Sequence, residues 1–287
     1  MARTTGRAGR RTSSGRPPIA LLTDFGYRDH YVGVMKGVIG AIAPAAPVID
    51  ITHGVDPQSV MGGALMLRES WRFFAPRTIF VAVVDPGVGT ARAAVAIETR
   101  AGARFVGPDN GVLSLAVEEA GPLRVVELRA PRYRLAEVSS TFHGRDIFAP
   151  AAAHLWRGVR LGALGPPMRE GLVRLELAEP REGLRELRGE VIYVDGFGNL
   201  ISNIGRDALA RFKARFSAMR LSVRIGAGGP LEIRETYGAV RKGVPLATFG
   251  SFGLLEIAVR DGSAARRFAA GPGAVVTIRP VRPKAHG

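Results

Sequence analysis

The chain of 287 residues contains no cysteine. This absence excludes disulfide bonds, zinc–thiolate sites, iron–sulfur clusters and a cysteine nucleophile. No apolar run reaches the roughly 18 residues that a membrane-spanning helix needs. We therefore expect that the chain is not an integral membrane protein and does not bind a membrane. A reducing compartment suits a chain without disulfides, and we expect a cytoplasmic location.

Lysine and aromatic residues are both scarce, although the chain is strongly basic. Its formal net charge is +15, and 36 of its 40 basic residues are arginines that are scattered from end to end. Nucleic-acid-binding proteins usually gather their positive charge in one patch, and aromatic side chains, which stack on bases, make up only 7% of this chain. We therefore expect no nucleic-acid partner, although a basic surface would still attract an anionic small molecule.

The remaining composition is that of a globular protein, with 46% hydrophobic and 23% charged residues over a length that suits two domains. Residues 1–18 are rich in arginine, glycine and serine, and we expect a disordered basic tail there. Short apolar strands alternate with helical segments over residues 19–170, which predicts a Rossmann-like α/β domain with a largely parallel sheet. Glycine and proline break residues 186–282 into short strands, which predicts a smaller antiparallel, barrel-like β domain.

Polar residues follow the predicted strands of the first domain. Asp24 and Asp85 each come directly after an apolar run. In an open α/β sheet the ligand crevice lies outside the carboxyl ends of the strands, so we expect these carboxylates to converge. His143 precedes a helix expected at 147–156, with Asp146 as its N-cap. A structural role remains the simpler interpretation of His143 taken alone.

Three common kinds of site find little support. The segment 87–89 has two glycines of a dinucleotide fingerprint, but the third glycine is missing and a strand-like segment follows in place of a helix. Asp24-Phe25-Gly26 occurs without the glycine loop, strand lysine and His-Arg-Asp loop of a protein kinase. The five histidines are dispersed without His-x-His or His-Glu-x-x-His spacing, and we expect no metal.

Two segments of the second domain suit a nucleoside that carries an amine. Asp195, Phe197 and Asn199 combine an acid, an aromatic face and an amide within five residues, and a plain hairpin turn is the alternative interpretation. The segment 250–259 contains glycines that allow a ligand to approach the backbone closely.

Taken together, the motifs of both domains resemble one family, the S-adenosyl-L-methionine (SAM) hydroxide adenosyltransferases, which are related to the fluorinase and the chlorinase. Six motifs occur in order between about residues 19 and 280. They are Thr-Asp-Phe-Gly at 23–26, Val-Asp-Pro-Gly-Val-Gly at 84–89, Gly-Pro-Asp-Asn-Gly at 107–111, Thr-Phe-His-Gly-Arg-Asp-Ile-Phe-Ala-Pro at 141–150, Phe-Gly-Asn and a later Asn at 197–203, and Gly-Leu-Leu-Glu-Ile-Ala at 253–258.

The resemblance implies that water or hydroxide attacks the 5′ carbon of the ribose of SAM, giving adenosine and L-methionine without a cofactor. It also implies a nucleophile triad of Asp85, Arg92 and His143, and a homotrimer with active sites at the subunit interfaces. The substrate-binding residues that it implies are Asp24 for the ribose diol, Asp195 for the methionine ammonium, Ser251 for the methionine carboxylate, Asn199 and Phe197 for the adenine, and Glu256 and Val259 in the closing segment.

Two other functions stay open. A SAM-dependent halogenase could share the scaffold, but this chain has Asp85 where the halogenating relatives carry an aromatic residue, and it lacks their inserted loop after Arg92. A carboxylate would repel a halide, which favours water as the nucleophile. A non-catalytic protein that binds adenosine or SAM is the second alternative. In the hydrolase, Arg92 would lower the pKa of a bound water, and either Asp85 or His143 could accept its proton.

Overall fold

The computed structural model describes residues 16–216 and 219–282. The chain divides into two compact units, an N-terminal unit that ends at Leu175 and a C-terminal unit that begins at Glu176. The tail expected at 1–18 lies outside the described residues except for its last three. The indole Nε1 of Trp156 donates a hydrogen bond to the carbonyl of Pro17 over 2.8 Å, which ties the start of the described chain to the N-terminal unit.

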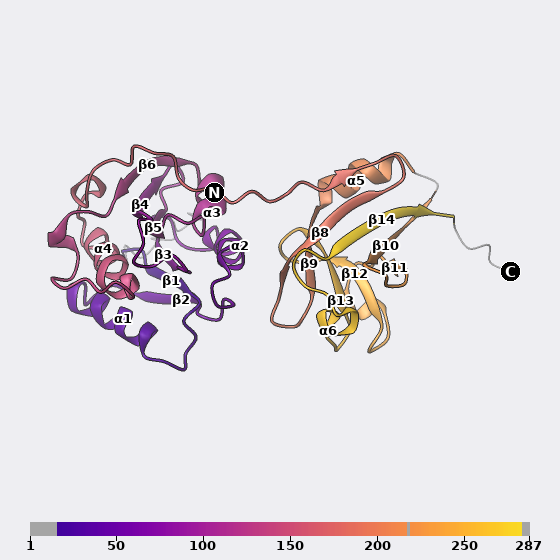
Figure 1. The fold of residues 1–287 in the computed structure, drawn as a ribbon, viewed down its shortest axis with the longest axis horizontal. Coiled ribbons are helices and arrows are strands. Elements are labelled where there is room, and N and C mark those ends of the chain that lie inside the picture. The colour runs from indigo at the N-terminus through magenta and orange to yellow at the C-terminus, as the bar shows by residue number, and fades with distance from the viewer. Residues whose placement is uncertain (1–15, 217–218, 283–287) are drawn as a thin grey trace, which may run out of the picture. The chain divides into compact units, whose positions relative to one another are not determined.

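A six-stranded sheet forms the centre of the N-terminal unit (Figure 1). Three of its strand pairs, β1 with β2, β1 with β3 and β3 with β5, are parallel, whereas β4 runs antiparallel to β5 and β6. Because β2 and β3 lie on opposite sides of β1, the strand order changes direction there, which is where open α/β sheets usually bind a ligand at the carboxyl ends of their strands. In the order β2-β1-β3-β5-β4-β6, the strands are β2 (Val48–Thr52), β1 (Ile19–Thr23), β3 (Ile79–Val83), β5 (Arg104–Pro108), β4 (Ala94–Thr99) and β6 (Pro122–Glu127).

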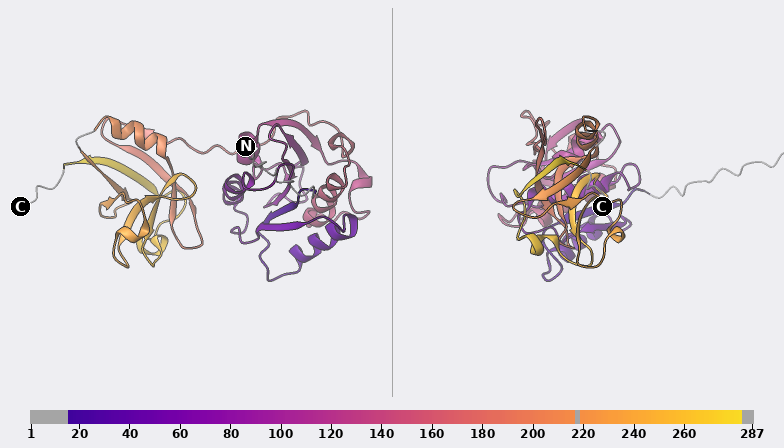
Figure 2. Two further views of the ribbon diagram at one scale, coloured as in Figure 1. Left: turned by 180° about the vertical axis from the view of Figure 1, so that it is seen from behind. Right: turned by 90° about the vertical axis from the view of Figure 1, so that its right-hand side faces the viewer.

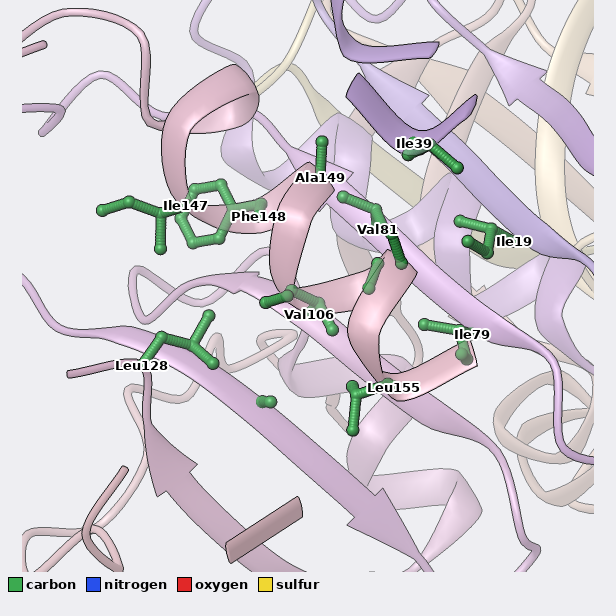
Figure 3. Close-up of a cluster of buried hydrophobic side chains, with 14 of the residues drawn as sticks. Ile19, Ile39, Ile79, Val81, Val106, Leu128, Ile147, Phe148, Ala149 and Leu155 are labelled. Atoms are coloured by element: carbon green, nitrogen blue, oxygen red, sulfur yellow. The ribbon is translucent and has the colours of Figure 1, made fainter. Parts of the chain in front are cut away.

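Helices cover both faces of this sheet. They are α1 (Tyr31–Ile42), α2 (Val60–Trp71), α3 (Ser114–Ala120) and α4 (Ala149–Trp156). Side chains of α1 and α4 share a buried cluster with one face, and those of α2 and α3 pack on the other. Figure 3 shows the first cluster, where Val81 and Val106 of the sheet lie with Ala149 and Leu155 of α4. Every residue of β1 and β3 is buried, as expected for parallel strands that are covered on both faces.

A π-helix at Gly144–Phe148 leads directly into α4. The expected helix therefore begins earlier, and the prediction that Asp146 is its N-cap is wrong. Asp146 lies inside the π turn, where its buried carboxylate accepts a hydrogen bond from the backbone N–H of Ser139 over 2.8 Å and pairs with Arg145. This bond fastens the segment before His143 to the turn after it. Single π turns in helices often occur at functional positions.

An antiparallel sheet of eight strands forms the C-terminal unit. Its order is β11-β10-β14-β8-β9-β13-β12, with β7 beside β8. A bridge between Ile233 and Ala247 joins the two ends of this order, so the sheet is nearly closed into a barrel. The strands are β7 (Arg181–Glu182), β8 (Leu187–Val194), β9 (Leu200–Gly205), β10 (Arg220–Ile225), β11 (Leu231–Glu232), β12 (Pro245–Phe249), β13 (Leu254–Val259) and β14 (Val275–Val281).

Two helices accompany this sheet, α5 (Arg206–Ala214) and α6 (Ala264–Phe268). Leu209 and Phe212 of α5 are buried in the core of the unit, and Figures 1 and 2 show this helix at one end of the sheet. Short 3-10 helices occur at Pro131–Tyr133, Leu161–Ala163 and Tyr237–Ala239.

The predicted fold class is confirmed. A Rossmann-like α/β sheet with parallel central strands forms the N-terminal unit, and an antiparallel, barrel-like sheet forms the C-terminal unit. In the part of the chain that the structure describes, no helix has both the length and the apolar character to cross a membrane.

Candidate active site

Asp24 begins the loop that follows β1. Strands β1 and β3 pair in register up to Thr23 and Val83, so the residues that follow them emerge side by side. Oδ2 of Asp24 accepts a hydrogen bond from the backbone N–H of Gln58 over 2.8 Å. Oδ1 has no hydrogen-bond partner among the described residues, which leaves it available to a ligand.

A tight turn after β3 carries Asp85 close to the segment that holds His143. Gly89 makes this approach possible, because a Cβ at this position would lie 2.4 Å from the carbonyl oxygen of Ser140. Its φ of 77° is also one that glycine adopts at little cost. The glycine of this motif therefore brings two segments that are distant in sequence into direct contact.

The structure brings Asp85, Arg92 and His143 together, the three residues that the resemblance implies for the triad. The guanidinium of Arg92 donates from Nε to Oδ1 of Asp85 over 3.0 Å and from Nη2 to Oδ2 over 2.5 Å. Nη2 of Arg92 also lies 2.7 Å from Nδ1 of His143. The side chains of Asp85 and Arg92 are only 5% and 9% exposed, so solvent screens this bidentate ion pair weakly.

The contact with Arg92 defines the state of the His143 ring. A guanidinium can only donate, so Nδ1 accepts, and a neutral ring then carries its proton on Nε2. Partial burial and the positive charge of Arg92 lower the pKa of His143. The imidazole is therefore neutral at pH 7 and presents an N–H donor at Nε2.

Asp109 and Asn110, which follow β5, have different surroundings. Nδ2 of Asn110 donates to the carbonyl of Val84 over 2.8 Å and so fixes the end of β3. Asp109 accepts a hydrogen bond from the backbone N–H of Val173 over 2.9 Å, and burial raises the pKa of its carboxyl. Asp109 also lines a polar cavity of about 1050 Å³, which Arg92 and His143 share.

A second cluster of polar side chains begins at Thr23, the residue before Asp24. The hydroxyl of Thr23 lies 2.8 Å from Nδ1 of His53, and Nε2 of His53 lies 3.1 Å from Oδ1 of Asp50. Nζ of Lys36 lies 2.7 Å from Oδ2 of the same carboxylate. Sequence reasoning missed this cluster because Thr23, Lys36 and the Asp50–His53 pair come from separate segments and no motif includes His53.

Asp195 organises the hairpin between β8 and β9 in the C-terminal unit. Its Oδ1 accepts hydrogen bonds from the backbone N–H groups of Phe197 and Asn199 over 2.9 and 2.8 Å, and its Oδ2 accepts one from Nδ2 of Asn199 over 2.9 Å. The motif is thus a hairpin turn. It also leaves the Phe197 side chain 82% exposed and the amide oxygen of Asn199 without a hydrogen bond to any described residue.

A cavity of about 800 Å³ lies beside this hairpin. The hairpin and the segment around β13 meet there, because β9 pairs with β13. The lining contains all six residues of this unit that the resemblance implies for the substrate, namely Asp195, Phe197, Asn199, Ser251, Glu256 and Val259.

Glu256 is the most deeply buried acid of this cavity, with 5% exposure. It forms no ion pair with a described residue, and the hydroxyl of Tyr237 donates a hydrogen bond to its Oε1. Burial, with a contribution from the charge of Asp195, raises the pKa of Glu256. A carboxylate that lacks a cationic partner favours a ligand with positive charge. Sequence reasoning missed Tyr237, which begins a short 3-10 helix without a recognisable motif.

Metal-ligating side chains do not gather at either cavity. Among the residues that the structure describes, no group of three or more histidine, aspartate or glutamate side chains is arranged to hold a metal ion. The structure thus places the predicted residues in two sets, with Asp24 and the triad in the N-terminal unit and the other six in the C-terminal unit.

The chain is similar to known proteins along most of its length. Residues 19–165 match the model of the SAM hydroxide adenosyltransferase N-terminal domain, and residues 189–277 match that of the C-terminal domain. An (R)-S-adenosyl-L-methionine hydrolase from Thermus thermophilus is 42% identical over 255 residues, which cover 86% of this chain and 93% of that protein.

Similarity also extends to a solved structure and to a halogenating enzyme. The crystal structure of an uncharacterized conserved protein from Thermotoga maritima has a TM-score of 0.82 at 38% identity and covers 91% of this chain and 99% of that one. A fluorinase from Actinoplanes sp. is 29% identical over 225 residues, which cover 69% of this chain and 75% of that protein. With both domain models matched in order, the chain belongs to the SAM hydroxide adenosyltransferase family.

Proposed function

We propose that this chain is a SAM hydrolase in which water or hydroxide attacks the 5′ carbon of the ribose. The bond from that carbon to the sulfonium sulfur breaks, and adenosine and L-methionine are the products. The contact of Arg92 with both Asp85 and His143 carries this proposal, because it sets a positive charge, a carboxylate and an imidazole around one small volume. Family membership and the names of the hydrolase relatives support the same activity.

The nucleophile, and not the leaving group, is the chemical difficulty. A sulfonium departs as a neutral thioether, so it needs no general acid and no cofactor. Water is a weak nucleophile, however, and hydroxide is scarce at neutral pH. The permanent charge of Arg92 lowers the pKa of a water that binds beside it. Because hydroxide and sulfonium cancel each other's charge as they react, a site with little water favours the step.

We assign the proton of the attacking water to Asp85. Each oxygen of this carboxylate uses one lone pair for Arg92 and keeps another. Nδ1 of His143 is already engaged and Nε2 carries the proton, so the ring donates to the water oxygen and orients it. The carbon–oxygen bond forms as the carbon–sulfur bond breaks, the bonding pair goes to sulfur, and one proton goes to the carboxylate.

The other predicted residues are proposed to hold the substrate. The free Oδ1 of Asp24 and the free amide oxygen of Asn199 support this, since each can accept a hydrogen bond from a ribose hydroxyl or from the adenine amine. The proposed assignments are Asp24 to the ribose diol, Asn199 and Phe197 to the adenine, Asp195 to the methionine ammonium and Ser251 to the methionine carboxylate. Glu256 and Val259, in the segment 250–259, are proposed as further contacts to the substrate in the same cavity.

The alternative of a SAM-dependent halogenase is less compatible with this site. A halide beside Asp85 would face a buried carboxylate that is 5% exposed, where repulsion is weakly screened. The carboxylate is useful to water, which must lose a proton, and useless to a halide. Incubation of the protein with SAM and chloride should therefore give no 5′-chloro product.

We further propose a homotrimer in which the triad of one subunit works with the cavity residues of its neighbour. The division of the predicted residues between the two units supports an arrangement of this kind. Light scattering should give three times the mass of one chain. Co-expression of Asp85→Asn chains with Asn199→Ala chains should restore part of the activity that each variant lacks alone, because one kind of mixed site keeps both wild-type halves.

The proposed substrate has one defined configuration at its sulfonium sulfur. The sulfonium sulfur of SAM is a stereocentre, and the relative from Thermus thermophilus is named for the (R) form. We propose the same epimer for this chain. Separated epimers, each followed by chromatography, should show faster consumption of the (R) form.

The decisive experiment is the reaction of SAM in isotopically labelled water. Mass spectrometry should find one labelled oxygen in adenosine and none in methionine, as attack at the 5′ carbon requires. Tight binding of adenosine with no release of methionine over hours would instead support a non-catalytic binding protein.

A further inference from the structure

Arg134 is a charged side chain without a counter-charge. It makes no hydrogen bond or ion pair with any residue that the structure describes, and its Nε is buried without a partner. Burial and the nearby charge of Arg129 lower the pKa of this guanidinium, although it stays charged at pH 7. A buried guanidinium donor that finds no acceptor is costly, which indicates that the acceptor comes from outside the chain.

Arg134 lines the cavity of about 1050 Å³ that also contains Arg92 and His143. Arg134 is close enough to His143 for its charge to contribute to the low pKa of that ring. The Nη2 and Nε atoms of Arg92 are already engaged by Asp85 and His143. Arg134 is therefore a guanidinium near His143 that remains free to bind a ligand.

The acids that face the same cavity do not neutralise Arg134. Glu127 is paired with Arg129 over 2.7 Å. Asp109 accepts a hydrogen bond from a backbone N–H, and burial raises the pKa of its carboxyl. Glu170 is exposed and lies in no ion pair with a described residue. Among the described residues of the lining, Arg134 is thus the partly buried cation without a counter-charge, and His143 adds a neutral N–H donor, which suits a small anion.

We propose that this cavity binds a small monoanion, of the size and charge of nitrate, chloride or formate, on the guanidinium of Arg134 beside His143. The anion accepts hydrogen bonds from Arg134 and lies in the cavity that Arg92 and His143 also line, whose lining does not include Asp85. A free solute anion is the occupant, not the carboxylate of the substrate. In an in-line displacement the methionine leaves from the side opposite the triad, so its carboxylate is carried away from Arg134.

The consequence for activity rests on the proposed hydrolase function. An anion on Arg134 offsets the positive charge near Arg92 and His143 that activates the attacking water, and it does so from a cavity whose lining does not include the Asp85 carboxylate. Bound anion should therefore lower kcat, with little change in the KM for SAM. Inhibition by salt would then depend on the identity of the anion and on Arg134, and not on ionic strength alone.

Anion binding can be measured without substrate. Chloride-35 NMR of the full-length protein should show line broadening that sodium nitrate reverses. Arg134→Gln should weaken this broadening about tenfold or more, whereas Arg134→Lys should keep part of it. Arg169→Gln, which removes an exposed arginine of the same cavity, is the matched control and should bind like wild type.

Kinetics then connect binding with turnover. Nitrate should inhibit wild type and Arg169→Gln at equal ionic strength, and it should not inhibit Arg134→Gln. Equal broadening in Arg134→Gln and wild type would overturn the proposal. A raised KM for SAM in Arg134→Gln, with no anion binding by wild type, would overturn it in favour of the substrate carboxylate. Anion binding by a protein that releases no methionine would contradict the hydrolase function but not the anion site.

Discussion

Nη2 of Arg92 lies 2.7 Å from Nδ1 of His143, and this contact separates the two candidate bases of the triad. Nδ1 can only accept from a guanidinium, so the neutral ring holds its proton at Nε2 and acts as a donor. A protonated imidazole would point an N–H at the Arg92 guanidinium and break the contact. Asp85, which keeps free lone pairs beside the same guanidinium, is left as the base.

The dependence of kcat/KM on pH should follow the fraction of His143 side chains that are neutral. Its pKa is lowered by burial and by Arg92, so kcat/KM should be constant above the ordinary value of 6.5 and should fall only at lower pH, as the ring becomes protonated. Initial rates of adenosine release between pH 4.5 and 8.5 test this. An acid limb centred above pH 6.5 would show that the ring is not held neutral by its surroundings.

His143→Gln separates a donor from a base. A glutamine amide can accept from Arg92 through its oxygen and donate to water through its nitrogen, so it reproduces both contacts of the neutral ring. We expect this variant to keep activity within about tenfold of wild type and to lose the acid limb, whereas His143→Ala should lose about a hundredfold or more in kcat. If glutamine were as damaging as alanine, the imidazole would have to be the base.

Replacement of Arg92 should affect turnover much more than binding. Arg92→Lys keeps the charge but cannot bind both oxygens of Asp85 and Nδ1 of His143 at once, so we expect kcat to fall about a hundredfold. The KM for SAM should change less than about fivefold. Arg124→Lys is the matched control, because that side chain is 68% exposed. Parallel losses in kcat and in affinity would assign Arg92 to binding only.

The sequence predicted the parallel core of the N-terminal unit, and of the residues proposed for the site, Arg92 and His143 line one cavity and six others line the second. The fully apolar runs at β1 and β3 are typical of strands buried on both faces, and Asp24 and Asp85 follow them at the carboxyl edge. Both lie where the strand order changes direction, which is the usual place for a ligand in such a sheet. The assignment of roles came from the family resemblance, since residue types alone left several kinds of site open.

Other features were not predictable from local patterns. Strand β9 escaped notice because Ser202 and Asn203 interrupt its apolar pattern, yet both side chains are buried. Oγ of Ser202 donates to the carbonyl of Leu255, and Nδ2 of Asn203 donates to that of Ala178, each over 2.6 Å. Such partners come from segments that are distant in the sequence, so tertiary contacts and not local sequence make these residues acceptable in a core.

The position of Asp146 shows a different limit. An aspartate before an apolar helical run is a normal N-cap signal, but here the helix starts one turn earlier as a π-helix. Asp146 satisfies the backbone of Ser139 instead, a contact that depends on how the loop before His143 folds back. The antiparallel direction of β4 follows from a connection of four residues to β5, which is too short for a helical crossover.

Asp24→Ala should weaken binding with little effect on the chemical step. Its free Oδ1 is proposed to accept from the ribose diol, and a hydrogen bond to a carboxylate contributes about 1.5–3 kcal/mol. The Kd for adenosine, measured by calorimetry, should therefore rise about tenfold or more. Asp56→Ala removes an exposed carboxylate two residues before Gln58, whose backbone N–H binds Asp24, and should leave the Kd unchanged. Unchanged affinity in Asp24→Ala would remove this residue from the ribose role.

His53 should position the loop that carries Asp24. The backbone N–H of Phe25 donates to the Thr23 hydroxyl, which leaves that hydroxyl to donate to Nδ1 of His53. The carbonyl of His53 in turn accepts from the N–H of Gly26 over 2.7 Å, so this buried residue holds the loop from both sides of Asp24. His53→Ala should raise the Kd for adenosine and lower the free energy of unfolding by about 2–3 kcal/mol.

His53→Asn distinguishes positioning from general support, because the asparagine oxygen can still accept from the Thr23 hydroxyl while the contact with Asp50 is lost. We expect His53→Asn to have the wild-type Kd for adenosine but a lower free energy of unfolding than wild type. Burial lowers the pKa of His53, so the unfolded state binds more protons and wild type should lose stability as pH falls below 6.5. Denaturant titrations at pH 5 and pH 7.5 should show that His53→Asn loses less than wild type over this interval. If both His53 variants lost stability while adenosine affinity stayed within twofold of wild type, the histidine would support the fold without positioning the loop.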